Sequence, residues 1–494
     1  MIAAVATMMS LAAGAQTMLP RSTPAAEGVE AKAITNFFDS LMTLDQTTMH
    51  HVMVLRHGKV IAEMHPAPFR QADVHTLYSE SKTFTSLAVG LCVDDGLLRV
   101  TDRVINFFPG DVPDTISQNL ADMTIRDLLT MTAGIKPDWN FRAVSLDWEK
   151  TFLAKWVAHK PGTKYQYDSM ATYMLSAIVQ RVTGKTVLQL LQNRLFDAMD
   201  IHDAQWELSP KGVCTGGWGL RISAESQVKM GQLLLQKGMW NGRQLISQNW
   251  VEEASKKQVQ PYKDGTTAHE KSPGYGYQIW RSAWPGSFRA DGAFGQYVMV
   301  LPNEDMVVLI NGMGFKTPSE LKYIWTQLMP GVKDGPIAAN AKDQKQLDRF
   351  CATAALPVVK GKATPKSLIG KTITVGEGAN KVSVTFDAAG QLHYTHADHS
   401  VTAANGKWLY ETTAQQPHYS ITPQDCFSGL KQEFTTAAEF GWNGKKLTIE
   451  TYWVDFITEE TIEITLLDDG NAHLYIKHNF DNKKPKINTT LPLK

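Results

Sequence analysis

The hydrophobic period of this chain changes twice along its length, and these changes restrict the fold more than any other feature. Alternating segments at 51–56 and 59–63, joined by His57-Gly58, predict a β-hairpin. From about 81 to 238 the pattern is mostly helical, and alternation returns between 275 and 310. We therefore expect the early hairpin and the late strands to share one antiparallel sheet, with the helices between them forming a separate lobe and a cleft in between.

The chain has 494 residues, more than one ordinary domain. A passage rich in lysine, glycine and proline, containing a short helix, predicts a linker at 336–368. Strand-like segments with turn signals such as Asn405-Gly406 follow it, as in a small barrel or sandwich. The predicted fold class is α+β, with an antiparallel sheet flanked by helices and a helical lobe at 20–335. A C-terminal all-β barrel or sandwich domain is predicted at 369–494.

One short motif, Ser79-Glu80-Ser81-Lys82, places a serine one helical turn before a lysine, as in serine acyl hydrolases. It opens an apolar segment, 84–93, that ends at Asp95-Gly96, which predicts a helix with the serine at its N-terminus. Unpaired N–H groups and the positive end of the helix dipole stabilise an oxyanion there. The same spacing also occurs at Ser226-Lys229, Ser319-Lys322 and Ser428-Lys431. We interpret all three as structural, and the first as a solvated pair.

Acyl transfer by Ser79 requires a second proton-handling group and a second oxyanion donor. Tyr167 precedes a helix predicted from Ala171, where the positive charge of Lys82 would favour its phenolate form; a packing aromatic residue is the alternative. Gly292 at a strand edge lets substrate backbone approach, and the Ala293 N–H would complete an oxyanion hole with that of Ser79. A β-bulge is the alternative at Gly292.

These segments together resemble the serine beta-lactamase and penicillin-binding protein superfamily, and specifically its class C beta-lactamase-related hydrolases and esterases. The resemblance covers about 20–330. It implies that Ser79 is acylated, that Lys82 and Tyr167 move protons, and that the N–H groups of Ser79 and Ala293 hold the oxyanion. The C-terminal strands resemble the lipocalin-like domain of some members. Five segments carry the main resemblance, in family order: 78–86, 128–134, 167–169, 216–221 and 291–297.

Two departures from the family pattern bear on the substrate. The family's Tyr-x-Asn ends in Ser169 here, and its Lys-Thr-Gly reads Ala290-Asp291-Gly292. Ser169, Asp291 and Gly292 are the predicted substrate-binding residues. Asp291 adds an acid where the family binds a substrate carboxylate, and strand alternation sends Arg289 to the face opposite Ala290. Since like charges repel, esters and small amides are favoured over beta-lactams and D-alanyl peptides.

Charge and hydropathy exclude some partners and predict a location. The 49 basic and 49 acidic residues cancel, and no basic run with interleaved aromatics occurs, which disfavours nucleic-acid binding. Residues 1–15 are apolar and small, which predicts a signal peptide cleaved after Ala15 and a periplasmic or secreted protein; a buried N-terminal helix is the alternative. No later run is long and apolar enough for an integral membrane segment.

Metal and redox chemistry have little support in the sequence. The four cysteines lack C-x-x-C spacing, although Cys351 and Cys426 are candidates for a disulfide in an exported protein. A histidine cluster near Asp398 has metal-binding composition, but a strand running into a turn would scatter its rings. We therefore expect no metal site and no cofactor. The three clustered histidines are His393, His396 and His399.

The leading hypothesis is an exported serine hydrolase that cleaves an ester or amide bond of a small molecule or peptide through an acyl-enzyme on Ser79. A beta-lactamase or D-alanyl peptidase acting on cell-wall-type substrates is the alternative within the same chemistry. A non-catalytic binding or scaffold protein on this fold is the alternative from another class.

Overall fold

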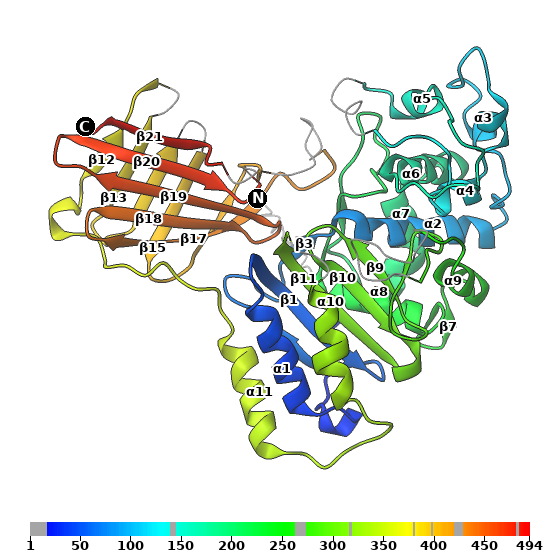
Figure 1. The fold of residues 1–494 in the computed structure, drawn as a ribbon, viewed down its shortest axis with the longest axis horizontal. Helices are drawn as coiled ribbons and strands as arrows, with labels where there is room; N and C mark the ends of the chain where they lie inside the picture. The colour runs from blue at the N-terminus through cyan, green and yellow to red at the C-terminus, as the bar shows by residue number, and fades with distance from the viewer. Residues whose placement is uncertain are drawn as a thin grey trace, which may run out of the picture.

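The computed structural model of this chain describes residues 17–138, 145–261, 273–315, 319–378, 381–396, 399–418, 428–480 and 484–494. The predicted signal peptide, Asp398 and Cys426 lie outside the described residues, so the predictions made for them stay predictions. A mixed sheet-and-helix portion comes first in the chain, and a separate C-terminal sheet lies to one side of it (Figure 1).

A six-stranded antiparallel sheet is the framework of the first portion, in the order β2-β1-β11-β10-β9-β8. The first hairpin strand lies against the last strand of the late group, with Val52 opposite Ile310 and Leu55 opposite Val307. The prediction that the early hairpin and late strands share one sheet is therefore confirmed. The strands are β1 Thr47–Arg56, β2 Lys59–Met64, β8 Trp280–Arg281, β9 Phe288–Gly292, β10 Gln296–Leu301 and β11 Met306–Gly314.

The alternation that begins at 275 predicts a first strand over 275–280, and this prediction is wrong for all but Trp280. The backbone of this segment packs against α9 (Gln248–Ser255), since a Cβ on Gly276 would lie 2.0 Å from the carbonyl oxygen of Ala254. Gln278 has a left-handed backbone, with φ of 63°. Close packing against a helix thus replaces the ladder that the aromatic composition predicts.

Both faces of the sheet are buried by helices. Val52 and Val54 face α1, α10 and α11, whereas Met53 and Leu55 face the core shared with α8 and the helical lobe, as strand alternation requires (Figure 1). The remaining helices are α1 Ala31–Met42, α2 Ser81–Asp94, α3 Gln118–Asp122, α4 Ile125–Leu129, α5 Trp148–Leu153, α6 Ser169–Thr183, α7 Val187–Leu191, α8 Ala224–Leu235, α10 Ser319–Tyr323 and α11 Ala341–Thr353. Short strands are β3 Val74–Thr76, β4 Gln205–Trp206, β5 Leu220–Ser223, β6 Met239–Trp240 and β7 Arg243–Gln244.

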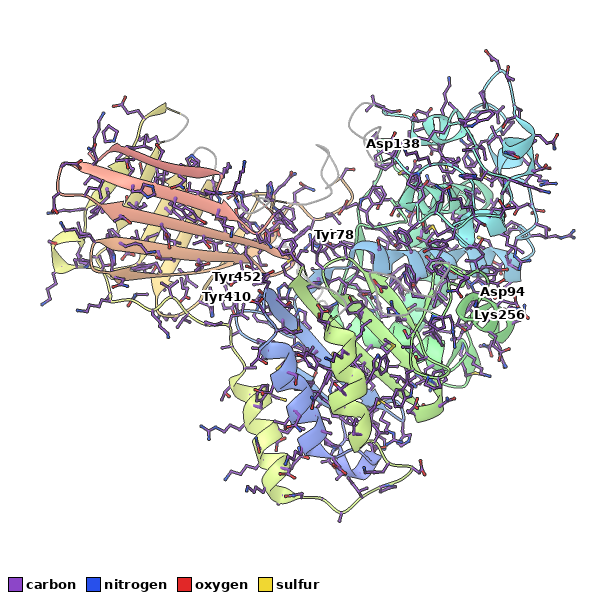
Figure 2. All side chains as sticks on the ribbon, in the orientation of Figure 1. Tyr78, Asp94, Asp138, Lys256, Tyr410 and Tyr452 are labelled. Atoms are coloured by element: carbon purple, nitrogen blue, oxygen red, sulfur yellow. The ribbon has the colours of Figure 1, made fainter. Side chains whose placement is uncertain are left out.

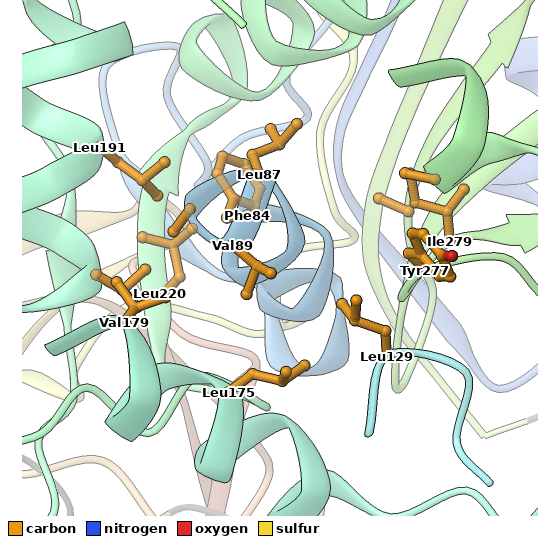
Figure 3. Packing of buried hydrophobic residues seen from close by; sticks show 14 of the residues in the cluster. Phe84, Leu87, Val89, Leu129, Leu175, Val179, Leu191, Leu220, Tyr277 and Ile279 are labelled. Carbon is orange, nitrogen blue, oxygen red and sulfur yellow. The ribbon is translucent and has the colours of Figure 1, made fainter. Parts of the chain in front are cut away.

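Helix α2 is buried on every side, at the centre of the larger hydrophobic core (Figure 3). Each residue from Ser81 to Cys92 is buried, and Phe84 and Leu87 lie on one side of the helix while Val89 points away from them (Figure 3). A helix that is apolar all round is stable only when it is enclosed in this way. The turn that precedes α2 is therefore held rigidly.

The C-terminal strands form a ten-stranded, barrel-like sheet, as the turn signals predict. The ends of this sheet approach each other, because Thr374 and Lys494 exchange two backbone hydrogen bonds. Alternate residues of β18 and β20 are buried inside it. Its strands are β12 Thr372–Val375, β13 Val382–Phe386, β14 Leu392–His396, β15 His399–Asn405, β16 Leu409–Thr413, β17 Phe434–Asn443, β18 Lys446–Trp453, β19 Thr458–Leu466, β20 Asn471–His478 and β21 Ile487–Pro492.

We expect Gly90→Ala to destabilise the protein, because a Cβ at this position in α2 would lie 2.4 Å from the indole of Trp250. Overpacking of this kind costs about 1–3 kcal/mol, which exceeds the higher helix propensity of alanine. Gly110→Ala is the matched control, since nothing lies within 4 Å of its Cβ position. Urea unfolding of both variants checks this, and equal unfolding free energies would contradict it.

Candidate active site

The predicted nucleophile lies in a one-turn 3₁₀ helix, Tyr78–Glu80, that leads directly into α2. Ser79 is partly exposed, whereas Tyr78 before it and Glu80 after it are buried. Ser79 is thus at the N-terminal end of the helix, as predicted, with only its own side chain open to approach. Tyr78 lies close to where the C-terminal sheet meets the first portion of the chain (Figure 2).

Lys82 is 1% exposed, and its ammonium group donates three hydrogen bonds. Its Nζ lies 2.9 Å from Ser79 Oγ, 2.8 Å from Ser169 Oγ and 2.6 Å from the carbonyl oxygen of Gly217. Burial lowers the pKa of Lys82 to about 7, although the nearby charges of Asp168 and Asp291 act to raise it. The site therefore holds an amine that exchanges its proton near neutral pH, in contact with the serine hydroxyl.

Tyr167 lies beside this lysine, with its ring centroid 4.8 Å from Lys82 Nζ. It precedes α6, which begins at Ser169, and the side chain of Asp168 caps that helix by accepting from Met170 N. The Tyr167 ring also stacks on Trp280 at 6.0 Å. The tyrosine therefore reaches the site from a loop that the helix cap holds, with one face against the lysine.

The turn between β9 and β10 meets the serine turn from the other side. A Cβ on Gly292 would lie 2.2 Å from the carbonyl oxygen of Leu77, so only glycine permits this approach. The ring of Phe294 contacts that of Tyr78, with centroids 5.2 Å apart. Ala293 lies between these two contacts and is exposed. The residues on either side of Ala293 therefore pack against Leu77 and Tyr78, which precede Ser79.

Asp291 does not stand as an uncompensated acid in this site. Arg289 Nε donates to Asp291 Oδ2 at 2.8 Å, and the guanidinium is fully buried. Residues two apart in a strand share a face, so the expectation that Arg289 lies opposite Ala290 also places it with Asp291. The pairing weakens the like-charge argument against a substrate carboxylate.

Two contacts at or near this site have no signal in the sequence. The carbonyl of Gly217 accepts from Lys82, but backbone acceptors leave no residue signature. Arg221 donates to Asp455 at 2.7 Å across 234 positions of sequence, with both side chains buried. A pairing over that separation has no local signal.

The solvated interpretation of Ser226 and Lys229 is wrong. Both are buried in α8, where Ser226 Oγ donates to Asp203 and Lys229 Nζ donates to the carbonyl oxygens of Met199 and Asp200. Their use is structural, as interpreted. The covering of α8 by the sheet and the lobe explains the burial.

The clustered histidines of the C-terminal sheet have separate partners. His399 is buried and shares the Glu460 carboxylate with His478, while His393 is exposed near Asp387. Within the described ranges, no group of three His, Cys, Asp or Glu side chains is arranged to hold a metal ion. The same ranges contain no helix long and apolar enough to cross a bilayer.

Comparison with known proteins identifies the family of this site. The sequence model described as beta-lactamase matches residues 36–328, more than half of the chain. The chain belongs to the beta-lactamase family. The 6-aminohexanoate-dimer hydrolase of Paenarthrobacter ureafaciens is 27% identical over 308 residues, covering 58% of this chain and 79% of that protein.

Two further relatives extend the comparison. The lovastatin esterase of Penicillium rubens is 26% identical over 164 residues, covering 28% of this chain and 41% of that protein. The crystal structure of SurE matches with a TM-score of 0.51 and 14% identity, covering 94% of this chain and all of SurE, which shows likeness of fold alone. This beta-lactamase-family chain is therefore a serine hydrolase of the amidase and esterase type.

We expect kcat/KM for an aryl ester to rise with pH through an apparent pKa of about 7, because a neutral Lys82 accepts the serine proton. Lys82→Arg keeps the charge at every pH and should lower kcat/KM at least about 100-fold. In Tyr167→Phe this limb of the profile, the rise of kcat/KM with pH near neutrality, should remain. Rate profiles from about pH 5 to about pH 9 check this, and loss of that limb in Tyr167→Phe would make the tyrosine the base.

Proposed function

We propose that this chain hydrolyses ester or amide bonds of small molecules through a covalent acyl-enzyme on Ser79. The observation that carries the proposal is the 2.9 Å contact between Ser79 Oγ and the buried Lys82 Nζ. Burial holds the pKa of Lys82 at about 7, so a fraction of the protein carries a free amine beside the hydroxyl at neutral pH. That is the condition for activating a serine.

In the first step Ser79 Oγ bonds to the substrate carbonyl carbon while its proton passes to Lys82, whose nitrogen lies over the ring of Tyr167. The carbonyl oxygen becomes an oxyanion that the N–H groups of Ser79 and Ala293 bind. Each such donor contributes about 3 kcal/mol in acyl-transfer enzymes. The bond to the leaving alcohol or amine then breaks, and that group takes the proton.

In the second step water attacks the acyl carbon and loses a proton to the same lysine and tyrosine pair. The ester bond to Ser79 breaks, the carboxylic acid departs, and Ser79 regains its proton. Ser169 Oγ holds Lys82 through a 2.8 Å hydrogen bond, and Gly292 gives substrate backbone access to the strand edge. Contact of Ser169, Asp291 and Gly292 with substrate is part of the proposal.

The names of two relatives favour ester and amide substrates. One is a hydrolase of 6-aminohexanoate dimer and another is an esterase of lovastatin. The negative charge of Asp291 supports this preference only weakly, because Arg289 pairs with that carboxylate. Export to the periplasm or medium is also proposed, on the apolar residues 1–15 alone.

We expect a fluorophosphonate probe to label the wild-type protein and not Ser79→Ala, whose kcat for a short-chain aryl ester should fall at least about 1,000-fold. Ser428→Ala is the matched control, because this serine has the same spacing to a lysine but is exposed. Mass spectrometry of the labelled peptide and ester turnover check both. An unlabelled wild type would support a binding or scaffold role instead.

The substrate class is tested by comparing kcat/KM of the wild type for a short-chain aryl ester, an aryl amide, a D-alanyl peptide and a chromogenic cephalosporin. We expect the ester or the amide to be turned over fastest. A larger kcat/KM for the cephalosporin or the D-alanyl peptide would favour the cell-wall-type alternative.

A further inference from the structure

Two aromatic residues with left-handed backbones flank the two proposed oxyanion donors. Tyr78 directly precedes Ser79 and has φ of 49°, and Phe294 directly follows Ala293 and has φ of 68°. Bulky residues rarely adopt this conformation, and it persists only where the surroundings enforce it. Because each peptide group is planar, the backbone angles of Tyr78 also set the direction of the Ser79 N–H.

Residues of the C-terminal part make up most of the hydrophobic cluster that contains Tyr78. The ring is 1% exposed and lies in a cluster with Met313 of β11. Phe480, after β20, meets Phe294 with ring centroids 5.4 Å apart and planes at 69°. Edge-to-face contacts of this kind favour one ring orientation over others. The other members of the cluster all come from the C-terminal part of the chain: Leu430, Phe434, Trp453, Phe456 and Ile457.

A buried ion pair fixes this part of the C-terminal sheet to the first portion. Asp455, in the turn between β18 and β19, accepts from Arg221 of β5 at 2.7 Å, with side chains 6% and 1% exposed. The guanidinium also lies 4.7 Å from the ring centroid of Phe456. Breaking a buried pair leaves an uncompensated charge, so the turn is held strongly in place. The same β5 segment follows Gly217, which accepts from Lys82.

We propose that the C-terminal sheet is a structural part of the catalytic centre. Phe480 is a positioning residue: its ring packs on Phe294, whose ring packs on Tyr78. These contacts hold Tyr78 in its left-handed conformation and thereby aim the N–H of Ser79. The inference rests on the proposed function, because this donor matters only when an acyl-enzyme forms on Ser79. Without the C-terminal contacts, the two turns would relax and the oxyanion would lose hydrogen bonds.

The test uses Phe480→Ala and Phe480→Leu in the full chain. For a short-chain aryl ester, Phe480→Ala should lower kcat about tenfold and leave KM within about twofold, because the oxyanion contact forms mainly in the transition state. The inhibition constant of an arylboronic acid, whose tetrahedral adduct places an oxygen at the oxyanion position, should rise by a similar factor. Phe480→Leu, which keeps apolar contact, should restore most of kcat and of boronate affinity.

Tyr410→Ala is the matched control, since it removes an aromatic side chain from the same interface, where the hydroxyl donates to the Pro68 carbonyl. It should leave kcat and boronate inhibition unchanged. Wild-type kcat and boronate affinity in Phe480→Ala would overturn the inference, as would an equal loss in Tyr410→Ala. If Phe480→Ala does not fold, as thermal unfolding will show, Phe480→Val takes its place, and kcat should again fall while KM stays within about twofold.

The outcomes separate this inference from the proposed function. A wild-type protein that neither hydrolyses esters nor reacts with the fluorophosphonate probe overturns the proposed function and the inference with it. An active wild type with a folded but unaffected Phe480→Ala or Phe480→Val variant overturns the inference alone.

Discussion

The structure of the site depends on one desolvated nitrogen, Lys82 Nζ, that finds all its hydrogen-bond partners within the protein. Its acceptors come from three distant segments: the serine turn, the start of α6 and the loop before β5. A buried ammonium without these acceptors would be strongly unfavourable. The requirement that stabilises the fold at this point also brings the hydroxyl of Ser79, the proposed nucleophile, to the amine.

The same burial has a chemical consequence. Removing water from Lys82 lowers its pKa to about 7, whereas the negative charge of Asp168 limits the fall. Burial raises the pKa of Asp168 itself to about 6. The proton-transfer properties of the site therefore follow from packing around α2 more than from any single charged neighbour. The apolar surroundings of that helix are thus as important to the chemistry as the polar residues.

Two arginine–aspartate ion pairs lie beside the site. Arg289 and Asp291 pair on β9, and Arg221 and Asp455 pair between the two portions of the chain. In each case the arginine is buried, so the aspartate is needed to compensate its charge. This explains why the acid in the strand motif is a weaker guide to the substrate than its sequence position indicates. The second pair joins the C-terminal sheet to β5, which lies beside the strand that leads to Ser79.

Local patterns in the sequence were sufficient to predict the shared sheet, the helix after Ser79, and the order of the segments that carry Ser79, Tyr167 and Ala293, because period and spacing are properties of neighbouring residues. They failed at 275–280, where contact with α9 overrides strand composition, and at Ser226 and Lys229, where burial depends on what covers the helix. Only the tertiary structure decided that Gly217 accepts from Lys82, that Asp455 pairs with Arg221, and that Phe480 packs on Phe294. These contacts join residues far apart in sequence, and their energies depend on burial that exists only in the folded chain.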